Sequence, residues 1–353
     1  MFFIEYGALL SMCCARKIKI WGVLFRYKLT TKDEMKYLLR WALTLGLAFL
    51  PLIGSAEIYP TKPIKLIVPW APGGATDQIA RMIGQALGQS LGTTVIVDNK
   101  AGAGGVIGTQ AFVKEKADGY TLLLATSSTN AAGPYLYSKL GFDPVNDFSH
   151  VILICSIPNV MVVPAKSNWN TLKDIVNDSS QHPNTYSYGS AGVGGSQHLA
   201  GAQFKTVTHI NINHVPYKGS GPAAQDLIAG HIDMMIDTGS LGSIKAGLLK
   251  AVAVASSKRI PALPNTPTFK EAGVDMVASA WYGLMLPAKA PPELVEKLNN
   301  EMNSILQKPE IRSKLTEMGA EVAGGSSHDF YKFALTELKR YESIVKDSGA
   351  PQE

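Results

Sequence analysis

Residues 64–91 read IKLIVPWAPGGATDQIARMIGQALGQSL, and the interpretation of the whole chain starts from them. The run 64–70 is mostly apolar and includes β-branched residues, which suits a buried strand. Pro-Gly-Gly at 72–74 interrupts this run. From Thr76 onward, apolar residues recur at helical spacing. A strand, a glycine turn and a helix are therefore predicted to follow one another directly.

This turn has a chemical consequence at the start of the predicted helix. The first backbone amides of a helix have no intrahelical partner and lie at the positive end of the helix dipole. Gly73 and Gly74 carry no side chain, so an anion can approach these amides closely. A plain strand-to-helix turn without any ligand is the alternative interpretation. A second turn of the same kind would favour an anion site.

The first 56 residues differ in character from the rest of the chain. Residues 35–56, MKYLLRWALTLGLAFLPLIGSA, combine a positively charged start, an apolar core too short for a membrane span, and small residues at the end. We interpret them as a secretory signal peptide cut after Ala56. Residues 1–34 are interpreted as an upstream extension from a misassigned start codon. An uncleaved membrane anchor is the alternative.

The net charge of the chain lies in this predicted leader. The full chain has 33 Lys and Arg against 28 Asp and Glu, a formal charge of +5. Eight of these bases and three of these acids fall within residues 1–56, which leaves 25 of each. A neutral remainder without basic runs argues against nucleic acid as a partner. Cys155 is the only cysteine beyond residue 56, so we expect it to be free and buried.

Short apolar runs alternate with helical patterns beyond the leader, which is typical of β-α-β units and mainly parallel sheets. Strands are predicted at 64–70, 94–97, 121–125, 151–154, 160–163, 186–188, 212–215, 232–236, 251–255 and 283–286. Helices are predicted from residue 76 and at 105–114, 171–178, 196–204, 222–229, 241–246, 268–273, 291–308 and 327–345.

Two segments resemble enzyme motifs, but each departs from its motif at one position. Residues 102–108, GAGGVIG, resemble a dinucleotide-binding fingerprint, but the third glycine is one position late. Residues 194–198, GGSQH, resemble the nucleophile elbow of a serine hydrolase, but His198 stands where the last glycine belongs. An exported hydrolase using Ser196 and His198 is kept only as an alternative, because no acidic partner is evident. The histidines show no metal-ligand spacing, so we predict neither a metal nor a cofactor.

A second glycine turn does occur, in the other half of the chain. Residues 189–195, GSAGVGG, follow a predicted strand, and Ser196 begins a predicted helix. Ser196 can cap that helix, or its hydroxyl can contact a ligand. Two such turns in different halves suggest a carboxylate held between two lobes. A third loop adds Tyr217 and Lys218, although a lysine here can equally be a solvated surface charge.

Six segments carry a resemblance to one known family. They are VPWAPGGATD (68–77), DNKAGAGGVIG (98–108), DGYTLL (118–123), GSAGVGGSQHL (189–199), VPYKGSGPAAQDLIAGHIDMMID (215–237) and PNTPTFKEAG (264–273). They resemble segments of the Bug-type extracytoplasmic solute receptors, the substrate-binding proteins of tripartite tricarboxylate transporters. The match runs in order from Tyr59 to Gly349. Trp70 departs from the family's usual smaller aromatic residue, which would narrow the pocket.

The resemblance implies an α/β, two-lobed periplasmic-binding-protein fold (type II-like) with a ligand cleft between the lobes. Lobe 1 would comprise 57–157 plus 281–353, and lobe 2 would comprise 158–280. The implied protein is a monomeric periplasmic receptor, not an enzyme, that captures a small organic carboxylate without a cofactor. It would pass the ligand to a permease made of a large and a small membrane subunit. A receptor of the same fold that signals to a sensor kinase is the alternative.

The resemblance also implies ligand contacts through backbone amides and hydroxyls, with no metal. From the first lobe the implied contacts are Trp70, Gly73, Gly74 and the loop at Ser128. From the second lobe they are Ser190, Gly194, Ser196, Tyr217 and Asp237, with His198 shaping the pocket one turn into its helix.

Overall fold

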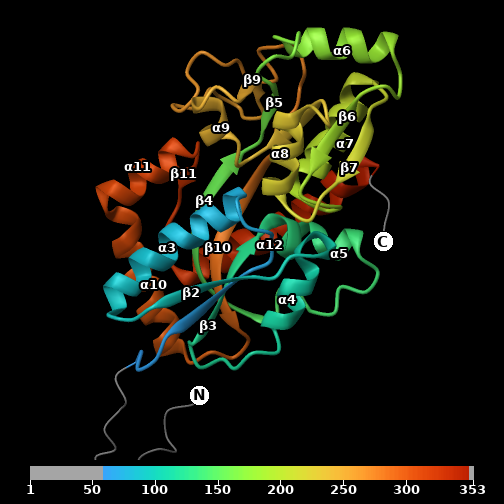
Figure 1. The fold of residues 1–353 in the computed structure, drawn as a ribbon. Coiled ribbons are helices and arrows are strands. Elements are labelled where there is room, and N and C mark those ends of the chain that lie inside the picture. Colours follow the sequence, from blue (N-terminus) through green and yellow to red (C-terminus); the bar gives the residue numbers. More distant parts are fainter. Residues whose placement is uncertain (1–58, 350–353) are drawn as a thin grey trace, which may run out of the picture. The chain divides into compact units, whose positions relative to one another are not determined.

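Figure 1 shows two β-sheets, each with helices packed around it. The computed structural model describes residues 59–349, and these belong to a single structural unit. The predicted signal peptide (35–56) and the predicted upstream extension (1–34) lie outside the described residues. None of the helices between residues 59 and 349 is long and apolar enough to cross a membrane.

The first sheet has six strands in the order β11-β4-β10-β3-β1-β2. β1 runs parallel to β2 and β3, whereas β10 is antiparallel to β3 and β4, and β11 is antiparallel to β4. Its strands are β1 (Ile64–Val68), β2 (Val95–Asn99), β3 (Thr121–Thr126), β4 (Phe148–Pro158), β10 (Ser279–Pro287) and β11 (Glu321–Val322).

Helices cover both faces of this sheet. Successive side chains of a strand point to opposite faces, so Leu66 of β1 joins the hydrophobic cluster that contains α3 and α10. Its neighbour Ile67 joins a second cluster with residues of α4, α5 and α12. The helical elements are α3 (Ala75–Leu91), η1 (Ala103–Gly105), α4 (Val106–Phe112), η2 (Ser128–Ala132), α5 (Gly133–Leu136), α10 (Pro292–Gln307), α11 (Pro309–Glu317) and α12 (Ser327–Ser348).

The helix α3 illustrates how the sequence produces this packing. Ile79, Ile83 and Leu87 recur at every fourth position, and all three are fully buried. Gly92 follows the helix in the left-handed conformation, with φ of 66°, and so terminates it. The predicted strand, turn and helix of this stretch are confirmed.

The second sheet has five strands in the order β7-β6-β8-β5-β9. β6 is parallel to β7 and β8, and β5 is antiparallel to β8 and β9. The strands are β5 (Val160–Pro164), β6 (Ser187–Ser190), β7 (Asn213–Pro216), β8 (Met234–Asp237) and β9 (Leu249–Val254). The accompanying helices are α6 (Leu172–Gln181), α7 (Ser196–Thr208), α8 (Ser220–Ala229) and α9 (Leu241–Lys245).

The chain passes between the two sheets twice, and the two connections are tied together. Asn159 separates β4 from β5, and the segment 255–278 leads from β9 to β10. The Asn159 amide donates to the carbonyl of Ala278 at 2.9 Å, and the Ala255 amide donates to the carbonyl of Asn159 at 2.8 Å. The buried Asn159 side chain donates to the Ile236 carbonyl at 2.8 Å. The two connections therefore form one hydrogen-bonded link.

Each predicted strand occurs, with ends shifted by a few residues, but the prediction of mainly parallel sheets is wrong. In residues 59–349 the two sheets are mixed, because β4, β5, β9, β10 and β11 all pair antiparallel with at least one neighbour. Hydrophobic periodicity reports burial and not strand direction, so a strand that returns from the other sheet looks like any other apolar run. Cys155 is free and buried, as predicted.

Two local predictions also need correction, and two short elements were missed. The helix expected at 268–273 is a turn, although Thr268 and Glu271 do form the reciprocal capping hydrogen bonds, at 2.7 and 3.1 Å. Pro309 does more than end α10, because it is the first residue of α11. The five-residue π-helix η2 and the two-residue strand β11 were not predicted, since both are too short to leave a periodic pattern.

Candidate ligand-binding site

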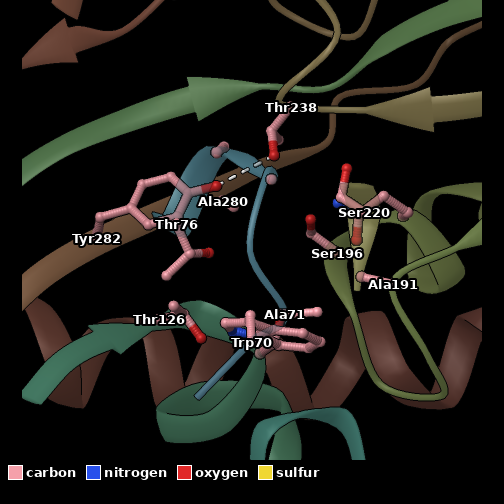
Figure 2. Close-up of a pocket in the computed structure, with 14 residues that line it drawn as sticks. Trp70, Ala71, Thr76, Thr126, Ala191, Ser196, Ser220, Thr238, Ala280 and Tyr282 are labelled. Carbon is pink, nitrogen blue, oxygen red and sulfur yellow. Dashed lines mark hydrogen bonds between the residues drawn. The ribbon is translucent and has the colours of Figure 1, made fainter. Parts of the chain in front are cut away.

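A small cavity lies between residues of the two sheets and the helices that start beside them (Figure 2). Its volume is about 20 Å³, measured as the space open to the centres of water-sized spheres. The described residues that line it include none with a charged side chain. They are Trp70, Ala71, Gly74, Ala75, Thr76, Thr126, Ser128, Ala191, Ser196, Gln197, Ser220, Thr238, Ala280 and Tyr282.

Three helices, α3, α7 and α8, begin at this cavity. Their first residues, Ala75, Ser196 and Ser220, all line it. In all three the N-cap residue is a glycine and makes no side-chain capping hydrogen bond. The first-turn amides of a helix lack intrahelical acceptors, and these three helices have no side-chain cap to replace them. Each helix start carries a partial positive charge of about half an elementary charge. Three positive helix ends around an uncharged cavity suit an anion.

Gly74 shows why glycine is needed at one of these starts. Its backbone is extended, with φ of −83° and ψ of 174°, so its conformation is open to any residue. Ser220 restricts the space for a side chain at this position, because a Cβ on Gly74 would lie only 3.1 Å from the Cβ of Ser220. The start of α3 thus approaches the start of α8 so closely that any side chain on Gly74 would require Ser220 to shift.

Loops associated with the two sheets also meet closely beside the cavity. The Tyr137 hydroxyl donates to the carbonyl of Val193 at 2.8 Å, which links α5 to the second glycine turn. A Cβ on Gly104 would collide with that same carbonyl. A Cβ on Gly221 would lie 2.5 Å from the carbonyl oxygen of Pro72. We call Gly74, Gly104 and Gly221 the glycine seam.

Of the residues predicted from the first lobe, Trp70, Gly74 and Ser128 line the cavity and Gly73 does not. Gly73 is exposed, and its amide donates to Oδ2 of Asp77 at 3.0 Å. This amide is therefore already paired with a carboxylate of the protein itself.

Of the residues predicted from the second lobe, only Ser196 lines the cavity. It is the first residue of α7 and follows the N-cap Gly195, so its side chain makes no capping hydrogen bond. Ser190 is fully buried behind the glycine turn, where its Oγ accepts from the Gly192 amide at 3.1 Å. Tyr217 points to α8, and its hydroxyl donates to Oδ2 of Asp226 at 2.7 Å.

His198 and Gly194 lie behind the cavity wall and contact each other. The Gly194 amide donates to Nδ1 of His198 at 3.2 Å, and the His198 ring stacks on His214 with centroids 4.2 Å apart. Burial lowers the pKa of His198 to about 4 and the pKa of His214 to about 3. Both rings are therefore neutral near pH 7, which leaves Nδ1 of His198 free to accept. Within residues 59–349 Ser196 and His198 share no hydrogen bond, so the hydrolase geometry is missing.

Asp237 does not line the cavity either, but it holds two residues that do. It is 1 % exposed and accepts four hydrogen bonds from three neighbouring elements. Oδ1 accepts from Nε2 of Gln197 at 2.9 Å and from Oγ of Ser220 at 2.7 Å. Oδ2 accepts from the Gly239 amide at 2.9 Å and from Oγ of Ser240 at 2.6 Å. Asp237 therefore fixes the starts of α7 and α8 against the end of β8.

Several lining residues were not predicted. Ser220 was missed because α8 was expected to begin at Pro222, whereas Pro222 is the third residue of the helix. A proline in a first turn could have indicated the earlier start. Thr238 and Tyr282 meet only because the end of β8 lies near the middle of β10, which no local pattern reports. Within residues 59–349, no group of three His, Cys, Asp or Glu side chains is arranged to hold a metal ion.

The family described as the tripartite tricarboxylate transporter family receptor, TctC, matches residues 79–350. The chain belongs to this receptor family. TctC receptors bind solutes and are not enzymes. Protein BugT of Bordetella pertussis (strain Tohama I) is one TctC relative, 36 % identical over 300 residues that cover 84 % of this chain and 92 % of BugT.

Solved structures give the same result for the fold of this TctC receptor. The periplasmic binding protein BugD has a TM-score of 0.80 at 31 % identity, covering 84 % of this chain and all of BugD. A protein of R. palustris solved with adipate has a TM-score of 0.81 at 34 % identity, with the same coverage. MatC from Rhodopseudomonas palustris, solved with malate, has a TM-score of 0.77 at 29 % identity and covers 81 % of this chain and all of MatC. The predicted two-lobed α/β fold is confirmed.

Proposed function

We propose that this receptor captures a small organic carboxylate at the three helix starts. The observation that supports this most directly is the convergence of α3, α7 and α8 on a cavity lined by hydroxyls and no charged side chain. Relatives solved with adipate and with malate bind carboxylates of this kind.

The expected energetics are sufficient for micromolar affinity. Each helix start contributes about 0.3–1 kcal/mol to an anion, and each hydrogen bond to a charged group contributes about 1.5–3 kcal/mol. Several such contacts offset an association cost of about 4–15 kcal/mol and leave about −8 kcal/mol, which corresponds to a micromolar Kd.

The proposed contacts differ in part from those implied by the sequence. Gly74, Ser196 and Ser220 would meet the carboxylate at the helix starts, and Trp70 and Ser128 would form the walls. The other predicted residues would act indirectly, by shaping or holding the loops behind the cavity. They are Gly73, Ser190, Gly194, His198, Tyr217 and Asp237.

Ligand entry would require the lobes to separate. A cavity of about 20 Å³ accommodates little more than a water molecule, whereas adipate or malate is several times larger. We propose that lobe 1 comprises residues 57–157 and 281–353 and that lobe 2 comprises residues 158–280, as the resemblance implies. The hydrogen-bonded link at Asn159 would then be the axis about which they open.

Calorimetric titration of the receptor with mono-, di- and tricarboxylates tests this function, after a thermal-shift screen that selects the best ligand. We expect binding with a rise in Tm, because a ligand that binds only the folded state stabilises it. The affinity should be the same in EDTA, since the proposed donors are amides and hydroxyls. An affinity that is lost in EDTA and restored by zinc or calcium would contradict the proposed site.

We propose further that the receptor works in the periplasm as a monomer and delivers its ligand to a permease of one large and one small membrane subunit. The family description supports a transporter partner. Loss of carboxylate uptake after deletion of the gene would support a permease partner over a sensor kinase.

Release of the exported protein into the periplasm would require the predicted cleavage after Ala56. N-terminal sequencing of the exported protein is expected to begin at Glu57, because Gly-Ser-Ala at 54–56 provides the small residues that signal peptidase needs. A protein that begins before Met35, or within the strand after Ile64, would contradict the predicted leader.

A further inference from the structure

One hydrogen bond at the cavity joins the two sheets. Oη of Tyr282 and Oγ1 of Thr238 lie 3.1 Å apart, as the dashed line in Figure 2 marks. Tyr282 belongs to β10 of the first sheet, and Thr238 directly follows β8 of the second. Their side chains are only 3 % and 4 % exposed, and both residues line the cavity. The two buried hydroxyls thus form a hydrogen bond with each other at the edge of the cavity.

This pair lies across the cavity from the starts of α7 and α8, where two of the proposed carboxylate contacts lie. In Figure 2, Tyr282 lies across the drawn cavity from Ser196 and Ser220, the first residues of α7 and α8. A ligand with its carboxylate at those helix starts would therefore extend its other end toward Tyr282. The wall beside the pair is apolar at Ala280, which offers that end no hydrogen bond.

We infer that Tyr282 and Thr238 select carboxylates that carry a second oxygen-bearing group at the far end. The inference rests on the proposed function and specifies its ligand class. A ligand that reaches the pair separates the two hydroxyls, and a carboxylate or hydroxyl terminus can replace the lost hydrogen bond on each side. A methyl terminus cannot, and it leaves two buried hydroxyls without partners, which is unfavourable.

Several neighbouring groups are less suited than this pair to recognise the far end of the ligand. Asp237 is adjacent to Thr238, but four donors already occupy its two oxygens. Thr126 lines the cavity, yet its Oγ1 lies within hydrogen-bond distance of Oγ1 of Thr129, at 3.3 Å. No lysine, arginine or histidine is among the described residues that line the cavity. Discrimination would therefore depend on hydroxyl hydrogen bonds and not on an ion pair.

Paired ligands that differ only at the far end test the inference. Succinate with butyrate, and adipate with hexanoate, each compare a carboxylate terminus with a methyl terminus on the same chain length. By calorimetry we expect the wild-type receptor to prefer the diacid at least about tenfold in one of the pairs, the equivalent of about 1.4 kcal/mol. Tyr282→Phe and Thr238→Val should each reduce this preference to roughly threefold or less, because each removes one of the two hydroxyls.

Tyr188→Phe is the matched control, because Tyr188 is an equally buried tyrosine, 2 % exposed, that packs in the second sheet's core and does not line the cavity. It should leave the preference unchanged. The preference is a ratio of two affinities, so a variant that only loosens the fold weakens both ligands alike and leaves the ratio intact. The double variant Tyr282→Phe with Thr238→Val should lose no more preference than either single variant, since the two hydroxyls act as one pair.

The outcomes separate the inference from the function on which it rests. A diacid preference that survives both single variants would overturn the inference and assign the discrimination to Thr76 or Thr126. A wild-type receptor without any diacid preference would overturn it too. Failure of all four ligands and of the wider carboxylate screen would instead contradict the proposed function itself, and the inference with it. If Tyr282→Phe does not fold, Thr238→Val, which preserves side-chain shape, carries the test alone.

Discussion

Gly221→Ala is expected to weaken carboxylate binding by roughly five- to 150-fold while the receptor stays folded. Gly221 is the second residue of α8, where alanine suits the helix at least as well as glycine. Its added Cβ would lie 2.5 Å from the carbonyl oxygen of Pro72, which is backbone and cannot rotate away. Such overpacking costs about 1–3 kcal/mol, and it arises only when the lobes come together on the ligand.

Gly242→Ala is the matched control for this variant. Gly242 is likewise the second residue of a helix, α9, and no atom lies within 4 Å of the position its Cβ would take. Calorimetric titration should show a raised Kd for Gly221→Ala and an unchanged Kd for Gly242→Ala, with both proteins melting at or above the wild-type Tm. Equal affinities for the two variants would mean that the approach of α8 to Pro72 plays no part in binding.

Asp237→Asn is expected to reduce the free energy of unfolding by about 3 kcal/mol and to weaken ligand binding in addition. Each oxygen of the Asp237 carboxylate accepts two hydrogen bonds. An asparagine amide keeps one accepting oxygen, and its NH2 group would face the two donors that bonded to the other oxygen. Each lost bond to a charged acceptor costs about 1.5–3 kcal/mol, while removal of the buried charge returns part of this. Gln197 and Ser220 would lose their fixed positions at the cavity.

Asp226→Asn makes the same substitution in α8, which packs on the same sheet, at a carboxylate that is 40 % exposed and accepts from Tyr217. Its effect on stability should be within about 1 kcal/mol. Urea unfolding of both variants measures the difference, and titration of the best ligand measures the effect on affinity. If Asp237→Asn behaves like Asp226→Asn in both measurements, Asp237 has no positioning role.

The order of elements could be predicted from the sequence because periodicity reports burial directly. The apolar run of β1 is buried and Ile79, Ile83 and Leu87 form the buried stripe of α3, as expected. The directions of β4 and β10 could not be predicted, because an apolar run of a given length reads the same whichever way the strand enters its sheet.

The residue pattern predicted the site at its glycine turns, and the family resemblance added Trp70 and Ser128, which also line the cavity. Gly74 and Ser196 lie at helix starts on the cavity, as two glycine-to-helix junctions suggested. Ser190 lies within the second junction and Asp237 ends β8, and both are polar, yet their side chains form hydrogen bonds behind the cavity wall. Which way a side chain turns depends on partners such as Gly192 and Ser220, and residue type alone does not reveal it. The Tyr282–Thr238 pair depends on two strands from different sheets, so it required the tertiary structure.

The glycine seam adds little to the strength with which the empty receptor holds itself shut. Gly104 and Gly221 lie against backbone carbonyls, and Gly74 faces the small side chain of Ser220, so the seam itself buries almost no apolar side-chain area. Hydrophobic attraction scales with that area, and the seam therefore adds little adhesion of its own. We expect the ligand to supply most of the free energy of closure, so that empty and loaded receptors differ in outline. A membrane partner could then recruit loaded molecules by shape alone, and empty ones would not compete for its docking site.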